Sequence, residues 1–257
     1  MRNEDALVKQ DPDTEAGLRH RSHKGLPVAL RIIAPIVRLM SRVLFKEHFR
    51  GSQNIPASGP AILVANHVSV VDPLAMAGYV WQAGRLPQFL IKDAVFKVAI
   101  VGSAMRVCRQ VPVTRGSAQA LKSLSAAIKI LHEGGVIVVY PEGTVTRQKE
   151  FWPMRAKTGV GRIALELPDV PIIPIWQDGA QKVWNHHTGK KSFFPRKITR
   201  IVAGEPLDLS TERALPEAVA MRAITDSIMN VITEGVGVLR NAAPPEVPPS
   251  LPTSEAL

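Results

Sequence analysis

Residues 61–73 read AILVANHVSVVDP, and this stretch decides the fold. Its first five residues are apolar and include β-branched side chains, which predicts a short buried strand. His67 follows the end of that strand. Asp72-Pro73 predicts a helix start, because Asp can cap free backbone N–H groups and Pro suits the first helical position. The stretch therefore predicts a strand, a turn that carries His67, and a helix that begins at Asp72.

This turn has the residue types for acid–base chemistry. A histidine at the mouth of an α/β sheet can take up a proton near neutral pH, and a carboxylate on its other ring nitrogen would fix its tautomer. On one continuous helix His67 and Asp72 would lie about 140° apart, so they meet only if the segment folds back. The alternative is that Asp72 only caps the helix. The spacing alone leaves both interpretations open.

A second stretch has the same design. Residues 136–140 read VIVVY, another buried-strand pattern, and Pro141-Glu142-Gly143-Thr144 follows. NHVSVVD resembles the NHxxxxD motif of the glycerolipid acyltransferases, and YPEGT resembles their FPEGT motif. Within that family the chain most resembles the lysophosphatidate (1-acylglycerol-3-phosphate) acyltransferases. The resemblance covers roughly residues 49–205.

The resemblance implies a reaction and its partners. His67 would be the general base and Asp72 its orienting partner. An acyl chain would pass from acyl-CoA or acyl-carrier protein directly to the free sn-2 hydroxyl of 1-acylglycerol-3-phosphate, giving phosphatidate in phospholipid synthesis. Direct attack needs no enzyme nucleophile, no cofactor and no metal. The chain accordingly lacks the G-x-S-x-G segment of nucleophile-elbow hydrolases.

The resemblance also implies residues that hold the acceptor phosphate, for which arginine forks are well suited. Arg115 closes a segment similar to the second family motif, although the family often has glycine where Arg109 stands. In the family an arginine often follows the motif threonine directly, whereas here Arg147 comes third. The expected substrate-binding residues are Arg115, Glu142, Gly143, Thr144, Arg147 and Lys157. The simpler alternatives are a surface charge for Arg115 and Lys157 and a turn or cap residue for Glu142.

Other functions are possible from the residues alone. The same motifs would serve another acceptor, such as glycerol-3-phosphate, another lysophospholipid or a glycosylated lipid. From a different class, the chain could be a non-catalytic basic module that binds membrane or nucleic acid. Ser69 could act as a nucleophile only if it were free, and His186-His187 lacks partners at metal-ligand spacing.

The composition favours a membrane partner. The chain has 257 residues, 46% of them hydrophobic, and a formal net charge of +10. Residues 19–50 hold eight basic residues and one acidic residue. Aromatic residues make up only 5%, fewer than RNA-binding surfaces use for stacking, so we expect no nucleic acid partner. The single cysteine, Cys108, excludes an internal disulfide and predicts a reducing compartment and a buried thiol.

The apolar residues 26–45 are interrupted by Arg31, Arg38 and Arg42, so we expect no membrane span. Pro35 predicts a split into two short helices. Arg38, Arg42 and Lys46 recur every fourth residue and predict one basic stripe on a helix that lies in an anionic bilayer interface. The alternative is a helix packed on the domain with a solvated basic face.

Strands alternate with helices along the chain, which predicts a single α/β domain with a central, mostly parallel mixed sheet flanked by helices. We expect a disordered N-terminus (1–24), a membrane-associated basic amphipathic helical segment (25–47), the acyltransferase domain (48–241) and a Pro-rich disordered tail (242–257). The expected location is the cytoplasmic face of the plasma membrane, as a peripheral or monotopic protein. Further strands are expected at 46–55, 88–92, 109–114, 170–176 and 198–203, and helices at 73–82, 93–105 with a break at Gly102, 117–133, 159–167 and 216–240.

Overall fold

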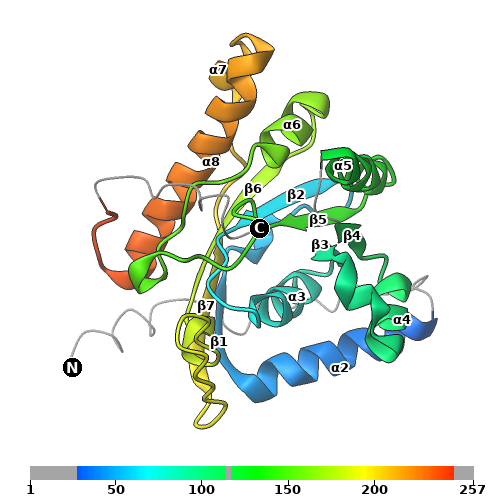
Figure 1. Ribbon diagram of the computed structural model, residues 1–257, viewed down its shortest axis with the longest axis vertical. Helices are drawn as coiled ribbons and strands as arrows, with labels where there is room; N and C mark the ends of the chain where they lie inside the picture. Colours follow the sequence, from blue (N-terminus) through cyan, green and yellow to red (C-terminus); the bar gives the residue numbers. More distant parts are fainter. Residues whose placement is uncertain (1–27, 114–116, 246–257) are drawn as a thin grey trace.

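The computed structural model describes residues 28–113 and 117–245 and contains a seven-stranded sheet at its centre (Figure 1). The strand order is β1-β7-β6-β2-β5-β3-β4, and all neighbours are parallel except β6 and β7. This confirms the predicted single α/β domain with a mostly parallel mixed sheet. The strands are β1 (Phe45–Arg50), β2 (Ala61–Ala65), β3 (Pro87–Lys92), β4 (Val111–Val113), β5 (Val136–Val139), β6 (Ile172–Asp178) and β7 (Lys197–Ala203).

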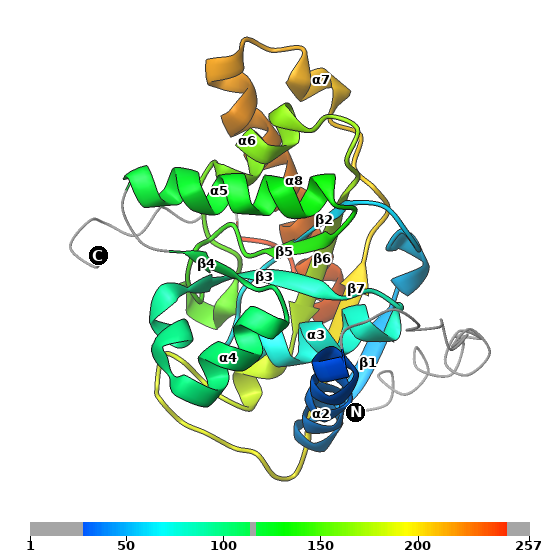
Figure 2. The same cartoon turned by 90° about the vertical axis from the view of Figure 1, so that its right-hand side faces the viewer.

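Helices cover both faces of the sheet (Figures 1 and 2). One face carries α2, α3 and α4, and the other carries α5, α6 and α8. The α-helices are α2 (Val28–Leu44), α3 (Asp72–Gln82), α4 (Ala99–Val107), α5 (Ser117–His132), α6 (Gly159–Glu166), α7 (Ser210–Arg213) and α8 (Glu217–Arg240). Short 3₁₀ helices lie at Ser52–Asn54, Asp93–Lys97, Lys149–Phe151 and Ala180–Lys182.

Strand β2 is buried on both faces because helices lie on both sides of the sheet. Leu63 and Ala65 belong to the core beneath α3, whereas Ile62 and Val64 belong to the core beneath α5, α6 and α8. A strand with two buried faces needs a continuous apolar run rather than an alternating one. This is why AILVA forms a central strand and brings the residues that follow it to the edge of the sheet.

Most predicted elements are present, with three local differences. The expected strand at 46–55 ends at Arg50 as β1, and the 3₁₀ helix Ser52–Asn54 follows it. The region 93–105 forms a 3₁₀ helix and then α4, and the break falls at Val98 rather than at Gly102. Gly102 lies inside α4, where a Cβ would come within 2.1 Å of the Phe96 carbonyl oxygen. Glycine is needed here because the preceding turn packs directly against the helix backbone. The four-residue helix α7 was not predicted.

Helix α2 corrects two predictions about the N-terminal segment. It runs as one helix through Pro35, whose ring is exposed, so the proline does not split it. Arg38 does not belong to a solvated stripe. It forms an ion pair with Glu47 of β1, donates to Gln82 of α3 at 2.9 Å and lies over the Phe49 ring.

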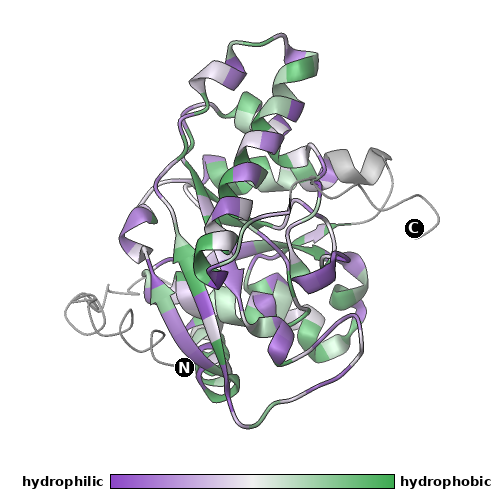
Figure 3. Ribbon diagram, turned by 90° about the vertical axis from the view of Figure 1, so that its left-hand side faces the viewer, coloured by the Kyte–Doolittle hydropathy of each residue, from purple (hydrophilic) through white to green (hydrophobic). Residues whose placement is uncertain are grey.

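The exposed surface of α2 is largely apolar. In Figure 3 this helix lies partly behind β1 at the lower end of the molecule, and its visible part includes hydrophobic colour. The third stripe residue, Lys46, lies in β1, so the predicted boundary at residue 47 cuts into the sheet. The exposed large side chains of α2 are Ile32, Ile36, Leu39, Met40 and Val43. The predicted N-terminus (1–24) lies outside the described residues, as does the tail from residue 246. Within the described ranges, no helix has the length and apolar character to cross a bilayer.

Helices α6 and α8 cross closely at Gly161, where a Cβ would lie 2.2 Å from the Met221 carbonyl oxygen. We therefore expect Gly161→Ala to force the helices apart and to lower the free energy of unfolding by roughly 1–3 kcal/mol. Gly159, two residues earlier, is the matched control, because a Cβ added there would meet no other atom within 4 Å. Urea denaturation of both variants checks this, and equal stabilities would contradict the close crossing.

Candidate active site

The two motifs meet at one edge of the sheet. Strands β2 and β5 are parallel neighbours, with Val64 paired to Val139, so they end side by side. His67 lies two residues beyond the end of β2, and Glu142 lies three residues beyond the end of β5. The carboxyl ends of parallel strands are the usual position for a site in an α/β sheet.

The segment between His67 and Asp72 folds back, so the two side chains meet. The His67 Nδ1 lies 2.9 Å from Asp72 Oδ2. The same oxygen accepts the backbone N–H groups of Val68 at 2.6 Å and Ser69 at 2.9 Å. Asp72 is the first residue of α3, but its carboxylate faces back into the preceding turn. Among the described residues, no backbone N–H group of α3 donates a hydrogen bond to it. The interpretation of Asp72 as a helix cap is therefore wrong.

This contact sets the chemistry of the imidazole. Asp72 is fully buried, and burial raises the pKa of its carboxyl group, while the bonds from His67, Ser69 and Val68 act in the opposite direction. A carboxylate only accepts, so Nδ1 carries the proton and donates. The His67 side chain is 15% exposed. Its Nε2 is consequently the nitrogen that can take a proton from a bound hydroxyl group.

Glu142 fixes the backbone of the His67 turn. Its Oε1 accepts the His67 N–H at 2.7 Å, and its Oε2 accepts the Met154 N–H at 3.0 Å. The Thr146 N–H donates in turn to the His67 carbonyl at 2.8 Å. Glu142 is only 1% exposed, and burial raises its pKa to about 8. This geometry gives Glu142 a positioning role between the motifs.

Tyr140 is a site residue that the sequence reasoning missed. Its ring stacks on the His67 ring, with centroids 4.3 Å apart and planes at 17°. Phe89 stacks next to Tyr140 in turn, with a centroid distance of 6.4 Å. Burial raises the pKa of Tyr140 well above its ordinary value, which keeps the phenol neutral. The signal in the sequence was an aromatic residue at the end of β5, one strand away from His67.

The sequence analysis also missed the pair Asn66 and Gln177, whose hydrogen bonds connect the end of β2 with β6. The Gln177 backbone N–H donates to Asn66 Oδ1 at 2.9 Å, and the Asn66 side-chain amide donates to the Gln177 carbonyl at 3.0 Å. The Gln177 amide also donates to the Asn66 carbonyl at 2.6 Å. Both residues are buried, so these bonds hold the residue before His67 in one position.

Three predicted substrate-binding residues surround the second turn. Gly143 has a φ of +73° and closes a turn in which its N–H donates to the Tyr140 carbonyl at 2.9 Å. The Lys157 side chain runs over Gly143, with Cε 3.4 Å from the position that a Cβ would take. Thr144 is half-buried beside them. The loop thus brings a cation directly to the glycine of the motif.

The remaining predicted substrate-binding residues are Arg147 and Arg115. Arg147 is exposed on the loop after the motif. Arg115 lies outside the described residues. Ser69 is buried and its Oγ donates to the Trp184 carbonyl at 2.8 Å, so this hydroxyl is not free to act as a nucleophile. Cys108 is buried as predicted, and burial raises its pKa.

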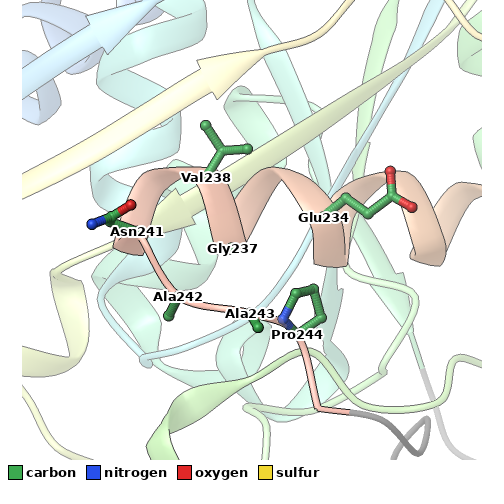
Figure 4. Close-up of a pocket in the computed structure, with 7 residues that line it drawn as sticks. All are labelled: Glu234, Gly237, Val238, Asn241, Ala242, Ala243 and Pro244. Carbon is green, nitrogen blue, oxygen red and sulfur yellow. The ribbon is translucent and has the colours of Figure 1, made fainter.

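No cluster of three potential metal ligands occurs among the residues that the structure describes. One pocket lies at the C-terminal end of α8, and none of the seven residues that line it belongs to either motif (Figure 4). Glu234 is the only acidic or basic side chain that lines it, and no histidine does, so it offers little for acyl transfer. The two motif turns are therefore the candidate active site.

The buried carboxyl group of Glu142 predicts a pH-dependent stability. Its folded pKa of about 8 lies above the ordinary value of 4.5, so its stabilisation is complete below about 4.5 and is lost as the pH rises through about 8. We expect the difference in free energy of unfolding between the wild type and Glu142→Gln to decrease over this interval. Chemical denaturation from pH 4.5 to 9 measures it, with the exposed Glu166→Gln as control. A difference that stays constant with pH would contradict the prediction.

Comparisons with known proteins find relatives in several organisms. The chain is 29% identical over 199 residues to tafazzin from Drosophila melanogaster, and this match covers 70% of the chain and 50% of tafazzin. It is 26% identical to a chloroplastic 1-acyl-sn-glycerol-3-phosphate acyltransferase from Brassica napus, covering 63% of the chain and 45% of that enzyme. It is also 26% identical to the 1-acyl-sn-glycerol-3-phosphate acyltransferase of Bacillus subtilis, covering 71% of the chain and 84% of that enzyme. The chain thus spans about half the length of the first two of these relatives.

The fold is shared with a solved structure. The crystal structure of the 1-acyl-sn-glycerophosphate acyltransferase PlsC from Thermotoga maritima matches with a TM-score of 0.62 and 22% identity, over 83% of this chain and 82% of PlsC. The family model named Acyltransferase matches residues 46–178, just over half of the chain, and this range contains His67, Asp72 and Glu142. The chain therefore belongs to the acyltransferase family.

Proposed function

We propose that this protein is a 1-acylglycerol-3-phosphate O-acyltransferase that forms phosphatidate in phospholipid synthesis. The observation that carries the proposal is the 2.9 Å contact between His67 Nδ1 and Asp72 Oδ2, which leaves Nε2 as a base. The names of the Brassica and Bacillus relatives support the choice of acceptor. The donor is an acyl thioester, and acyl-CoA and acyl-carrier protein would both serve the same chemistry.

The chain's own residues supply the acid–base part of the reaction. His67 Nε2 takes the proton of the sn-2 hydroxyl as its oxygen attacks the thioester carbonyl carbon. The tetrahedral intermediate then collapses, the C–S bond breaks, and the imidazolium returns the proton to the departing sulfur. Asp72 stabilises the imidazolium, while Tyr140 and Glu142 keep the ring and its backbone in place.

The acceptor phosphate requires cations near this edge of the sheet. Lys157 lies over Gly143, whose missing side chain allows close approach of the backbone, and Arg147 follows on the same loop. We assign the phosphate to these two residues together with Arg115, Thr144 and the Gly143 backbone. Glu142 supports this group from within the protein and does not need to contact the substrate.

A different acceptor is the second candidate function. The relatives include tafazzin and an N-acylphosphatidylethanolamine synthase from Arabidopsis thaliana, 26% identical over 178 residues. The second name indicates that a relative of this chain makes a product other than phosphatidate. The phosphate-binding residues distinguish the candidates, because a free phosphate monoester carries more negative charge than a phosphodiester headgroup and gains more from Lys157 and Arg147.

We also propose a peripheral or monotopic position on the cytoplasmic face of the plasma membrane. The acceptor and the product are lipids, so the site must reach a bilayer. Helix α2 exposes five large apolar side chains, and Val98, Ile100 and Val101 are exposed next to it at the start of α4. Large apolar side chains that are exposed together on neighbouring helices are typical of interaction sites.

The catalytic assignment predicts the effects of two substitutions. We expect His67→Ala to abolish transfer and Asp72→Asn to reduce kcat by about 10²–10⁴-fold, because general-base assistance is worth that factor. The assay uses purified protein, radiolabelled palmitoyl-CoA or palmitoyl-carrier protein, and a panel of lysophosphatidate, glycerol-3-phosphate and other lysophospholipids. Wild-type turnover in a folded His67→Ala protein would refute the mechanism. A preference for another acceptor would select the second candidate function.

The corrected orientation of α2 predicts how this helix binds lipid. Because the outward face is apolar, we expect Leu39→Ser combined with Met40→Ser to weaken binding to vesicles strongly, even in high salt that screens charges. The matched control is Arg42→Gln, which removes an exposed cation and should weaken binding only to anionic vesicles at low salt. Co-sedimentation with vesicles measures both. Equal binding of the double variant and the wild type would place the lipid contact elsewhere.

A further inference from the structure

The connection between β6 and β7 contains an exposed aromatic pair among cations. We call residues 183–196 the basic aromatic loop. Phe194 is 71% exposed and Phe193 is 40% exposed. Lys190, Lys191 and Arg196 are exposed on both sides of the pair. Aromatic rings beside basic side chains are typical of segments at a bilayer interface, where the rings enter the acyl boundary and the cations stay with the headgroups.

The first half of this loop is fixed to both catalytic motifs. The Trp184 carbonyl accepts the Ser69 hydroxyl at 2.8 Å, next to the His67 turn. His187 Nε2 donates to the Thr146 carbonyl at 2.8 Å, and the His187 ring stacks on Phe151 with centroids 4.3 Å apart. Thr146 is the residue whose N–H binds the His67 carbonyl. The loop is thus connected through Ser69 and Thr146 to the turn that carries His67, the proposed base.

The second half of the loop is fixed to α2. Arg196 Nη1 donates to the Arg42 carbonyl at 2.7 Å, near the end of that helix. One residue later, Lys197 of β7 pairs with Phe45, which directly follows α2. Figures 1 and 2 both show the loop and α2 side by side at the lower end of the molecule. The basic aromatic loop therefore lies beside the C-terminal end of α2, the helix that exposes large apolar side chains.

We propose that the basic aromatic loop is a second membrane-contacting element, in which Phe193 and Phe194 enter an anionic lipid bilayer while Lys190, Lys191 and Arg196 bind its headgroups. This proposal rests on the proposed function, and it adds a lipid contact that is separate from α2. Because Trp184 and His187 hold the two motif turns, seating the loop in lipid also sets the distance of the active site from the bilayer.

Charge favours a bilayer over a second copy of the chain as the occupant of this surface. Two copies that met through this loop would bring the same three cations together and would repel each other. An anionic headgroup layer complements these cations, and the chain has a net charge of +10. The two phenylalanines lie between the cations in the sequence, so the rings can enter the acyl region while the cations on either side stay with the headgroups.

The test uses a fluorescent label at the loop. Cys108, the single cysteine, is changed to Ala in the full chain, and Phe194→Cys is labelled with an environment-sensitive dye. Val219→Cys is the matched control, because Val219 is also an exposed apolar residue (53%) but lies at the opposite end of the molecule in Figure 1, at the start of α8. We expect vesicles of phosphatidylglycerol and phosphatidylcholine to shift the dye at position 194 to the blue. Lipids with a doxyl group near the headgroup should then quench it, with no change at position 219.

Two results would overturn the proposal. The dye at position 194 could stay unchanged on vesicles to which the protein binds. Alternatively, it could shift with protein concentration in the absence of lipid, which would identify a second copy as the occupant.

A second measurement does not depend on labelling. The variant combines Phe193→Ser with Phe194→Ser, and acyl transfer is measured to two acceptors, one embedded in vesicles and one short-chain acceptor dissolved as monomers. We expect the rate with the vesicle acceptor, divided by the rate with the dissolved acceptor, to decrease about ten-fold or more. An unchanged ratio would overturn the proposal. If the wild type transfers to no lysolipid at all, the proposed function fails, while the dye still decides whether the loop enters the bilayer.

Discussion

The active-site edge depends on one buried carboxyl group. Glu142 accepts the backbone N–H groups of His67 and Met154, so it connects the turn after β2 with the loop after β5. A buried carboxyl group is costly unless its oxygens are hydrogen-bonded, and here each oxygen has an N–H donor. The same bonds that offset the burial of Glu142 therefore also fix the backbone of His67, the proposed base.

His67 is held from three directions, and each contact comes from a different part of the chain. Asp72 binds Nδ1 from the start of α3, Tyr140 covers one face of the ring from the end of β5, and Thr146 binds the carbonyl. These contacts are compatible only because β2 and β5 are adjacent and parallel. Preorganisation of this kind lowers the cost of aligning the base with a bound hydroxyl group.

Local patterns in the sequence predicted the strands and the motif residues because each depends on a few neighbouring side chains. The apolar runs AILVA and VIVV form β2 and β5, and His67 and Glu142 come together beyond their ends. The spacing of His67 and Asp72 could not decide whether they meet, because the answer depends on backbone N–H groups of Val68 and Ser69 that fold onto the carboxylate. The stacking of Tyr140 depends on strand order, which no local pattern contains.

The error at α2 has the same origin and explains the surface of the protein. The four-residue spacing predicted that Arg38 and Arg42 share one solvated stripe. Arg38 instead contacts Glu47 on β1 and Gln82 on α3, and the spacing along α2 holds no information about these other elements. The inner face of the helix buries Leu30, Ala34 and Ser41 beside the Arg38 contacts. Five other large apolar residues of α2 are exposed: Ile32, Ile36, Leu39, Met40 and Val43. Those residues are left to face outward, the reverse of a helix on a water-facing surface. The buried Leu30 and the polar contacts of Arg38 together attach α2 to the domain, which leaves the exposed apolar side chains available to a partner such as a bilayer.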